Sequence, residues 1–245
     1  MKKKRTKDIE VIHEDDELII LNKPADVLSV PDRYNPDILN LYTFLKSQRE
    51  QVFIVHRIDR ETSGIICFAK TKEAHKYLTK QFSKRETEKV YHTIVQGHLH
   101  QKEGTINLPI GENSFKRGTV RIDKHGGKPA VTHYKVIEEF KNFSHLEVQI
   151  ETGRMHQIRV HLEAIGHPLA IDKIYSGKKS FYLSSVKKKY HINRTGIERP
   201  IMYRVTLHAS QISFLHPKTE EKVTYTAELH KDFAVMLKML RKYDK

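Results

Sequence analysis

The chain has few of the features that mark secreted, membrane or low-complexity proteins. It has one cysteine, Cys67, which excludes an intrachain disulfide and a paired-cysteine metal site. Cys67 lies in the apolar run IICFA, so we expect a buried structural thiol in a reducing compartment. The N-terminal MKKKRTKDIE lacks the apolar stretch of a secretory signal, and no segment is apolar for long enough to cross a bilayer. We therefore predict a soluble, cytoplasmic protein.

Acidic residues are scarce relative to basic ones. The chain has 30 Asp and Glu against 44 Lys and Arg, a formal net charge of +14. This excess favours a polyanionic partner, with nucleic acid first and an acidic membrane surface second. With only 11 glycines and 8 prolines in 245 residues, the chain is not a low-complexity polymer and is long enough to bury a core.

Several common catalytic and cofactor motifs are also missing. The sequence has no GxxxxGK[ST] phosphate loop and no GxGxxG, so a nucleotide cofactor is not expected. Its 16 histidines include no HExxH pair, and His156 and His161 are five residues apart, which does not align them on one helical face. No GxSxG nucleophile elbow occurs either. These absences argue against a zinc hydrolase and the common acyl-transfer enzymes.

The hydrophobic pattern predicts one α+β domain over residues 9–245, preceded by a basic tail at residues 1–8. Alternating or continuous apolar runs predict strands, and helical spacing recurs around residues 41–45, 72–86 and 230–242. A loop followed by a short helix is expected within residues 152–168. Residues 173–197 contain seven Lys and Arg and no acidic residue, which predicts a mobile basic insert.

Asp59 stands out because a dense polar insert, residues 56–64, separates two apolar runs, residues 52–55 and 65–69. A carboxylate between Arg57 and Arg60 at the edge of a core could be a salt bridge that pins the loop. Neighbouring cations and a tight loop would also keep an attacking aspartate ionised and oriented. Residue spacing leaves both interpretations open and favours the salt bridge modestly.

A second polar cluster runs from Thr152 to His161 and includes Arg154, His156 and Arg159. Its simpler interpretation is a basic loop and helix N-terminus that contact phosphate. The alternative is that one of its arginines meets Asp59. Spacing does not decide between these two.

Six ordered motifs make the chain resemble the RluA-type RNA pseudouridine synthase family. HRIDRETSGIICFAK resembles the family's HRLDxxTSGLLLFAK, and LNKPADVLSVP is similar to its NKPxG segment. The remaining likenesses are KVYHTIVQG, GGKPAVTHYKVIE, ETGRMHQIRVHLEAIGHPLAIDKIYSG and LHASQISFLHPKTEE. The resemblance runs along almost the whole chain and raises the catalytic interpretation of Asp59 far above the salt bridge.

The resemblance implies a fold, a chemistry and a set of residues. The fold would be a mixed, mostly antiparallel sheet with a central catalytic cleft and flanking helices. Asp59 matches the catalytic aspartate, which attacks a uridine at either the sugar or the base so that the base is detached, rotated and rejoined through carbon. Tyr91 matches the active-site tyrosine, and Arg159 the arginine that pairs with the aspartate. No cofactor and no metal are implied.

The resemblance also implies an RNA partner, either rRNA or tRNA, with the target nucleotide flipped out of its helix. Arg57 matches the arginine that can enter the RNA stack, and Ile158 or its neighbours would form the apolar wall of the pocket. The other predicted RNA-binding residues are His56, Arg154, His156, Lys187, Lys188 and Lys189. We expect a monomer without membrane contact and without the separate N-terminal RNA-binding domain of many relatives.

The sequence departs from the family pattern at a few positions. Asp26 and Glu220 stand where glycines are usual, Ile171 replaces the Gly before Asp172, Met155 replaces a Thr or Ser, and Thr93 replaces an Ala. These changes put local loop geometry in doubt rather than the chemistry. Two other hypotheses stay open: a non-catalytic RNA-binding or ribosome-assembly factor, and a metal-dependent nuclease that uses Asp59, Glu61 and Asp172.

Overall fold

A computed structural model describes residues 9–192 and 196–245 of the chain. The described residues form two compact units. Unit 1 contains the N-terminal part through Tyr91 together with His208–Glu228, and unit 2 contains His92–Leu207 and Leu229–Lys245. The predicted basic tail at residues 1–8 lies outside the described residues, as does Arg194 of the predicted basic insert.

Unit 1 is built on strands that follow one another in the order β1-β2-β4-β11, with β12 beside β11 and β3 beside β4. Their bounds are β1 Glu10–Glu14, β2 Leu18–Lys23, β3 Phe53–Ile54, β4 Ser63–Ala69, β11 Leu207–Leu215 and β12 Lys222–Thr226. The pairs are antiparallel except β11 with β4, which is parallel. β2 and β4 are buried along their whole length, as expected for continuous apolar runs.

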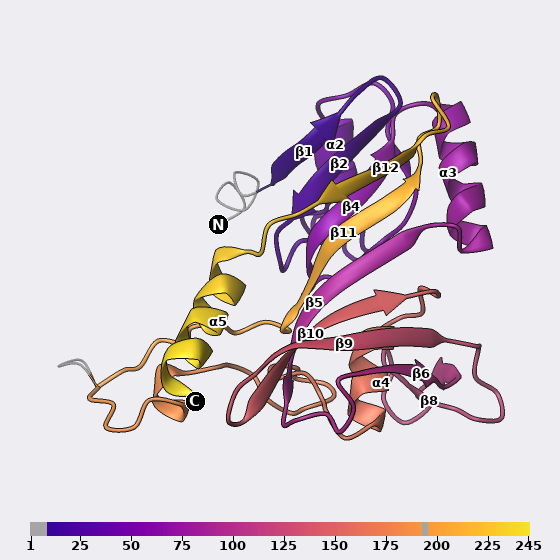
Figure 1. The fold of residues 1–245 in the computed structure, drawn as a ribbon. Helices are drawn as coiled ribbons and strands as arrows, with labels where there is room; N and C mark the ends of the chain where they lie inside the picture. Colours follow the sequence, from indigo (N-terminus) through magenta and orange to yellow (C-terminus); the bar gives the residue numbers. More distant parts are fainter. Residues whose placement is uncertain (1–8, 193–195) are drawn as a thin grey trace. The chain divides into compact units, whose positions relative to one another are not determined.

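Two helices cover this sheet. Asn40 caps α2, Leu41–Lys46, and Thr71 caps α3, Lys72–Lys84, each through a side-chain oxygen that accepts a backbone N–H. α3 packs along β4 and β3 (Figure 1). The core of unit 1 lies between the sheet and α2 and consists of Ile19, Leu21, Val27, Leu41, Leu45, Val52, Ile66 and Phe68.

Unit 2 contains most of β5, which begins in unit 1, and the remaining strands and helices. The strands are β5 Glu88–Gln96, β6 Glu103–Asn107, β7 Ile110–Glu112, β8 Val120–Ile122, β9 Val131–Glu139 and β10 Phe143–Ile150. β10, β9 and β6 pair in that order and antiparallel, and β7 pairs with β8. The helices are α4 Gln157–Ala164, the short 3₁₀ helix η1 Leu183–Ser185, and α5 Lys231–Tyr243.

The helices of unit 2 bury one face each. α4 packs against β8 and β9 (Figure 1). α5 buries Phe233, Met236, Leu237 and Leu240 in a cluster with residues of β5 and of the chain after α4. This amphipathic spacing is what the sequence predicted for the last helix.

The observed class is the predicted one, an α+β fold with a mixed, mostly antiparallel sheet. One local expectation was wrong. The buried strand expected over residues 52–55 is only the two-residue β3 and is half-buried, because it pairs with β4 alone. Within the basic insert, the side chains of Phe181 and Val186 enter the core of unit 2, and the mobility of the insert stays a prediction.

Cys67 is fully buried as expected, and burial raises the pKa of its thiol. Among the described residues, no helix combines the length and apolar character that crossing a bilayer requires.

Candidate active site

The loop that carries Asp59 connects β3 to β4 in unit 1. The loop leads into Ser63 and Gly64, the first two residues of β4. The φ of Gly64 is +111°, and a Cβ there would lie 2.0 Å from the carbonyl oxygen of Ala209 on β11. Only glycine therefore allows β4 to approach β11 this closely. The parallel register of His208 with Ser63 and of Ala209 with Gly64 begins at this point, four residues after Asp59.

The residue before Asp59 is held by Ser29. The Ser29 hydroxyl donates to the carbonyl of Ile58 at 2.9 Å and accepts from the Ile58 N–H at 3.2 Å. Ser29 and Ile58 are both buried, so this one hydroxyl provides hydrogen-bond partners for the N–H and the carbonyl of Ile58, which would otherwise lack them. The backbone that enters Asp59 is fixed as a result.

The residue after Asp59 is held by Lys23. The Nζ of Lys23 donates to the carbonyl of Arg60 at 3.0 Å, and also to the carbonyls of Pro24 and Val27 at 3.0 and 2.8 Å. The Lys23 side chain is fully buried, and an amine is buried only when its donors are satisfied. The N–H of Asp26 donates to the same Arg60 carbonyl at 2.8 Å. The loop is thus attached to residues 23–29 on both sides of Asp59.

His56 supports the start of the loop. Its Nε2 accepts the N–H of Cys67 at 3.0 Å, and its ring stacks on Phe82 of α3 with centroids 4.7 Å apart. Burial, and secondarily the charge of Lys89, lowers the pKa of His56 to about 3. The ring is neutral at physiological pH, which the acceptor role of Nε2 requires. Its predicted contact with RNA stays a prediction.

Tyr91, at the end of the unit 1 part of β5, is only 8% exposed. Burial raises the pKa of its hydroxyl, and the negative charge of Asp59 raises it further. This tyrosine therefore keeps its proton throughout the physiological range and can donate a hydrogen bond. Asp59 and Tyr91, which lie 32 positions apart in the sequence, are electrostatically coupled in unit 1.

The second polar cluster forms the start of α4 in unit 2. Thr152 donates its hydroxyl to Oε1 of Gln157 at 2.7 Å, and the amide of Gln157 donates to the carbonyl of Val131 at 2.9 Å. His161 bonds to the Thr132 hydroxyl and to the Leu108 carbonyl, both at 2.9 Å. These buried bonds attach α4 to β9 and fix which side chains it projects.

Arg159 makes a bidentate ion pair with Asp172. Its Nε and one terminal nitrogen donate to the two carboxylate oxygens at 2.6 and 2.8 Å, and both side chains are at most 2% exposed. Burial acts to raise the pKa of Asp172, but the hydrogen bond and charge of Arg159 hold it below its usual range. The Asp172 carboxylate also accepts the N–H groups of Ile174 and Tyr175. The predicted pairing of Arg159 with Asp59 stays a prediction.

Tyr175 links Arg159 to the loop before α4. Its ring lies 5.2 Å from the Arg159 guanidinium carbon, and its hydroxyl is 3.1 Å from Nδ1 of His156. His156 has a φ of +51° and stands directly before the helix. Arg154 donates its Nε to the carbonyl of Pro129 at 3.3 Å.

The remaining predicted residues differ in their exposure. Arg57 is exposed, and so are Lys188 and Lys189. Lys187 is half-buried, with its Nζ 5.5 Å from the centre of the Tyr243 ring. Ile158, the predicted apolar wall, is buried in α4. Among residues 9–192 and 196–245, no three His, Cys, Asp or Glu side chains are grouped to hold a metal ion.

Sequence reasoning missed Lys23, Ser29 and Asp172 as residues that hold the predicted catalytic side chains. A signal for the first two was present, because both lie in the segment LNKPADVLSVP that carries one of the family motifs. The motif does not show which backbone groups these side chains meet, because the two contacts span 37 and 29 residues of sequence.

Comparisons with known proteins agree on one family. The family described as RNA pseudouridylate synthase matches residues 17–164. A protein of Neisseria meningitidis serogroup B named ribosomal large subunit pseudouridine synthase D is 35% identical over 238 residues, which cover 95% of this chain and 61% of the relative. The protein of the same name from Zymomonas mobilis is 34% identical over 242 residues, 95% of this chain and 73% of the relative.

Solved structures show the same fold. The human protein titled RNA Pseudouridylate Synthase Domain Containing 4 matches with a TM-score of 0.70 and 24% identity, over 98% of this chain and 95% of that chain. Human RNA Pseudouridylate Synthase Domain Containing 1 matches with a TM-score of 0.66 and 25% identity, over 96% and 95%. The chain belongs to the RNA pseudouridylate synthase family.

Proposed function

We propose that this protein is an RNA pseudouridine synthase, an isomerase that converts specific uridines in structured RNA to pseudouridine. The observation that carries the proposal is the loop of Asp59, which buried bonds from Ser29 and Lys23 hold on both sides. A nucleophile needs a fixed direction of attack, and rigid backbone on both sides provides it.

In the proposed reaction Asp59 attacks the target uridine, at the sugar or at the base. The bond between the sugar and the base nitrogen breaks, the base rotates, and a bond to a base carbon replaces it. The product has the same atoms as the substrate, so the reaction consumes no oxidant, reductant or group donor. We expect no cofactor and no catalytic metal.

Tyr91 is proposed to contact the uracil. Its ring provides an aromatic face for stacking, and its hydroxyl keeps its proton because burial and Asp59 raise its pKa. A protonated hydroxyl can hydrogen-bond a uracil carbonyl or relay a proton to the base after rotation. Tyr91→Phe should therefore retain stacking and lose the hydroxyl contribution.

The target base lies inside paired or stacked RNA, so the enzyme is proposed to flip it out. Exposed Arg57 is proposed to fill the vacated place in the stack. Phosphate contacts from Arg154, His156 and Lys187–Lys189 would offset the cost of unstacking. The Arg159–Asp172 pair fixes α4, the helix that directly follows Arg154 and His156.

Ribosomal RNA is the proposed substrate class, ahead of tRNA. The curated relatives described above are named ribosomal large subunit pseudouridine synthase D. This chain spans 61% of the length of the first of them, so its substrate class is a proposal of its own. A monomeric, cytoplasmic enzyme is part of the same proposal.

Carbodiimide adducts and reverse-transcription stops on unmodified rRNA and bulk tRNA test the proposal. The parent protein should create at least one new stop, and Asp59→Asn should create none while it binds RNA with unchanged affinity. Asp172→Asn is not a suitable control because it disrupts a buried ion pair; Asp37→Asn, in an exposed loop, is. Turnover by Asp59→Asn would refute the proposed role of Asp59. The absence of new stops with both the parent and the variant would favour the non-catalytic RNA-binding alternative.

A further inference from the structure

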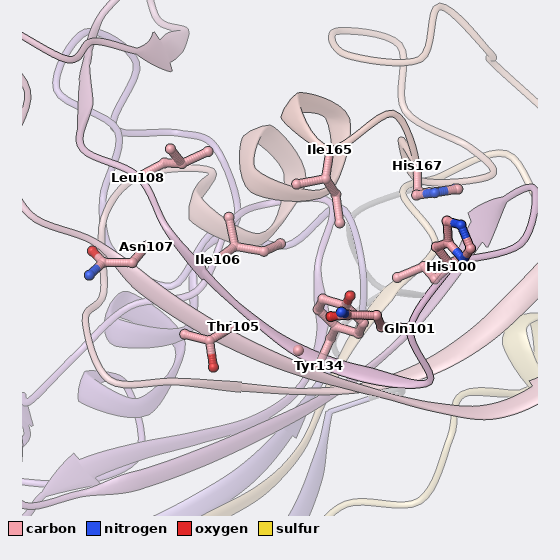
Figure 2. A pocket seen from close by; sticks show the side chains of 11 residues that line it. His100, Gln101, Thr105, Ile106, Asn107, Leu108, Tyr134, Ile165 and His167 are labelled. Atoms are coloured by element: carbon pink, nitrogen blue, oxygen red, sulfur yellow. The ribbon is translucent and has the colours of Figure 1, made fainter.

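Unit 2 contains a pocket that none of the predicted site residues lines. It lies between β6 and the segment after α4 and has a volume of about 710 Å³ (Figure 2). Leu99, Ile106 and Ile165 contribute apolar walls, and Tyr134 lies among them. This volume is in the range of pockets that hold small organic ligands. The pocket can therefore take a planar molecule or part of one.

Polar side chains stand at both ends of the pocket. Figure 2 shows His100, Gln101 and His167 at one end and Asn107 at the other. Within residues 9–192 and 196–245, the side chains of Gln101 and Asn107 make no hydrogen bond, and neither does the Tyr134 hydroxyl. His167 donates Nδ1–H to the carbonyl of Gln96 at 3.1 Å, which leaves its Nε2 for a ligand.

Tyr134 is held as a flat platform. It is paired with Gly104 across β9 and β6, and a Cβ at Gly104 would lie 2.6 Å from the Tyr134 hydroxyl oxygen. The Tyr134 ring therefore lies across Gly104 and occupies the space that the side chain of any larger residue at position 104 would need. An aromatic ring supported in this way offers its free face for stacking.

The charge of the pocket indicates which part of an RNA chain it suits. None of its lining residues is Asp, Glu, Lys or Arg, whereas the chain as a whole carries a net charge of +14. Phosphate groups would be attracted to the basic surfaces elsewhere. The uncharged walls, the aromatic platform and the amide groups match a nucleobase, which has apolar faces and a polar edge.

We propose that this pocket binds an unpaired nucleobase of the RNA substrate, separate from the uridine that reacts. The proposal rests on the proposed function for the presence of RNA. Gln101 and Asn107 contact the edge of the base, and Tyr134 stacks on its face. The pocket thereby favours RNA that presents a single-stranded nucleotide in addition to the uridine that is modified.

Fluorescence of 2-aminopurine tests this proposal, because its emission falls when the base stacks. The full-length protein is titrated with a single-stranded RNA decamer that carries 2-aminopurine, and with the same decamer paired in a duplex. Quenching is expected with the single strand only. Tyr134→Ala should abolish most of the quenching and raise the Kd for the single strand between about fivefold and a hundredfold, the range for one lost base–aromatic stack.

Two further variants keep the test decisive if Tyr134→Ala folds poorly. The double variant Gln101→Ala/Asn107→Ala changes only exposed side chains, and it should raise the Kd for the single-stranded decamer several-fold. Because no charge is removed, the dependence of log Kd on log salt concentration should keep its slope. Ile137→Ala, on the same strand β9 and three residues away, is the matched control and should change nothing.

The outcomes separate this proposal from the proposed function. Equal Kd values for the parent and the Gln101/Asn107 variant would overturn it, as would displacement of the decamer by micromolar free adenosine or uridine, which would indicate a nucleoside site. Asp59→Asn should lose pseudouridine formation and keep the quenching. Loss of quenching in the pocket variants with normal quenching in Asp59→Asn supports a base-binding pocket distinct from the reacting centre.

Discussion

The hydroxyl of Ser29 spans both hydrogen-bonding groups of Ile58, accepting from its N–H at 3.2 Å and donating to its carbonyl at 2.9 Å. This contact joins the loop after β2 to the residue directly before Asp59. Ser29, although distant from Asp59 in the sequence, thereby helps to fix the position of the Asp59 carboxylate.

Ser29→Ala should lower turnover more than it lowers RNA affinity. Loss of the hydroxyl leaves two buried backbone groups unsatisfied, which costs about 1–3 kcal/mol of unfolding free energy. Displacement of Asp59 should reduce kcat at least tenfold with KM nearly unchanged. Single-turnover assays and denaturant unfolding measure both effects. Ser213→Ala, which removes another buried serine hydroxyl in unit 1, is the control and should lower stability without the loss of kcat.

Gly64→Ala should prevent stable folding of unit 1. The new Cβ would lie 2.0 Å from the Ala209 carbonyl oxygen, and the backbone φ of +111° is one that L side chains rarely adopt. We expect a loss of several kcal/mol, seen as a large drop in the thermal midpoint. Gly153→Ala is the control, because a Cβ there meets nothing within 4 Å. Similar midpoints for the two variants would contradict this account of the β4–β11 approach.

Glu220→Gly should stabilise the protein. Glu220 has a φ of +58° in the turn between β11 and β12, a backbone conformation that favours glycine. Removal of the strain of a left-handed glutamate should raise the free energy of unfolding by about 1–2 kcal/mol. The greater conformational freedom of glycine in the unfolded chain should lower it by about 0.5–1 kcal/mol. A net gain near 1 kcal/mol is expected by denaturant titration. Glu221→Gly, one residue later and without positive φ, should instead lower stability.

Acid should destabilise the protein partly through His56. Its pKa is about 3 in the folded protein and about 6.5 in an unfolded chain, so the unfolded state binds more protons between these values. The stability that a neutral His56 contributes is complete above pH 6.5 and is lost as pH falls towards 3. His56→Gln should flatten this decline by up to about 1.4 kcal/mol per pH unit. Substitution of exposed His125 should leave the slope unaltered.

Neutralisation of Lys187, Lys188 and Lys189 to glutamine should weaken RNA binding and flatten its salt dependence. Each lost phosphate contact reduces the slope of log K against log salt concentration by about 0.7–0.9. Lys187 is half-buried beside Tyr243, so the exposed pair should contribute most of the change. The control removes the same charge at exposed Lys141, Lys218 and Lys238. Equal slopes for the two triple variants would show that residues 187–189 are only a solvated surface.

The amino-acid sequence by itself determined the class of fold and the family. Alternating and continuous apolar runs predicted most of the strands, and amphipathic spacing predicted α3 and α5, because these signals depend only on local periodicity. The ordered motifs identified Asp59 as the candidate nucleophile, since a motif records residue type and spacing.

Only the tertiary structure decided how the candidate residues are held. Lys23 and Ser29 meet the Asp59 loop, and Arg159 meets Asp172, through contacts between segments distant in sequence. It also brought Tyr134, Gly104 and Ile165 around one pocket. Such contacts depend on strand register and on close approach of backbones, which residue spacing does not encode, because a shift of one position would turn every side chain to the other face.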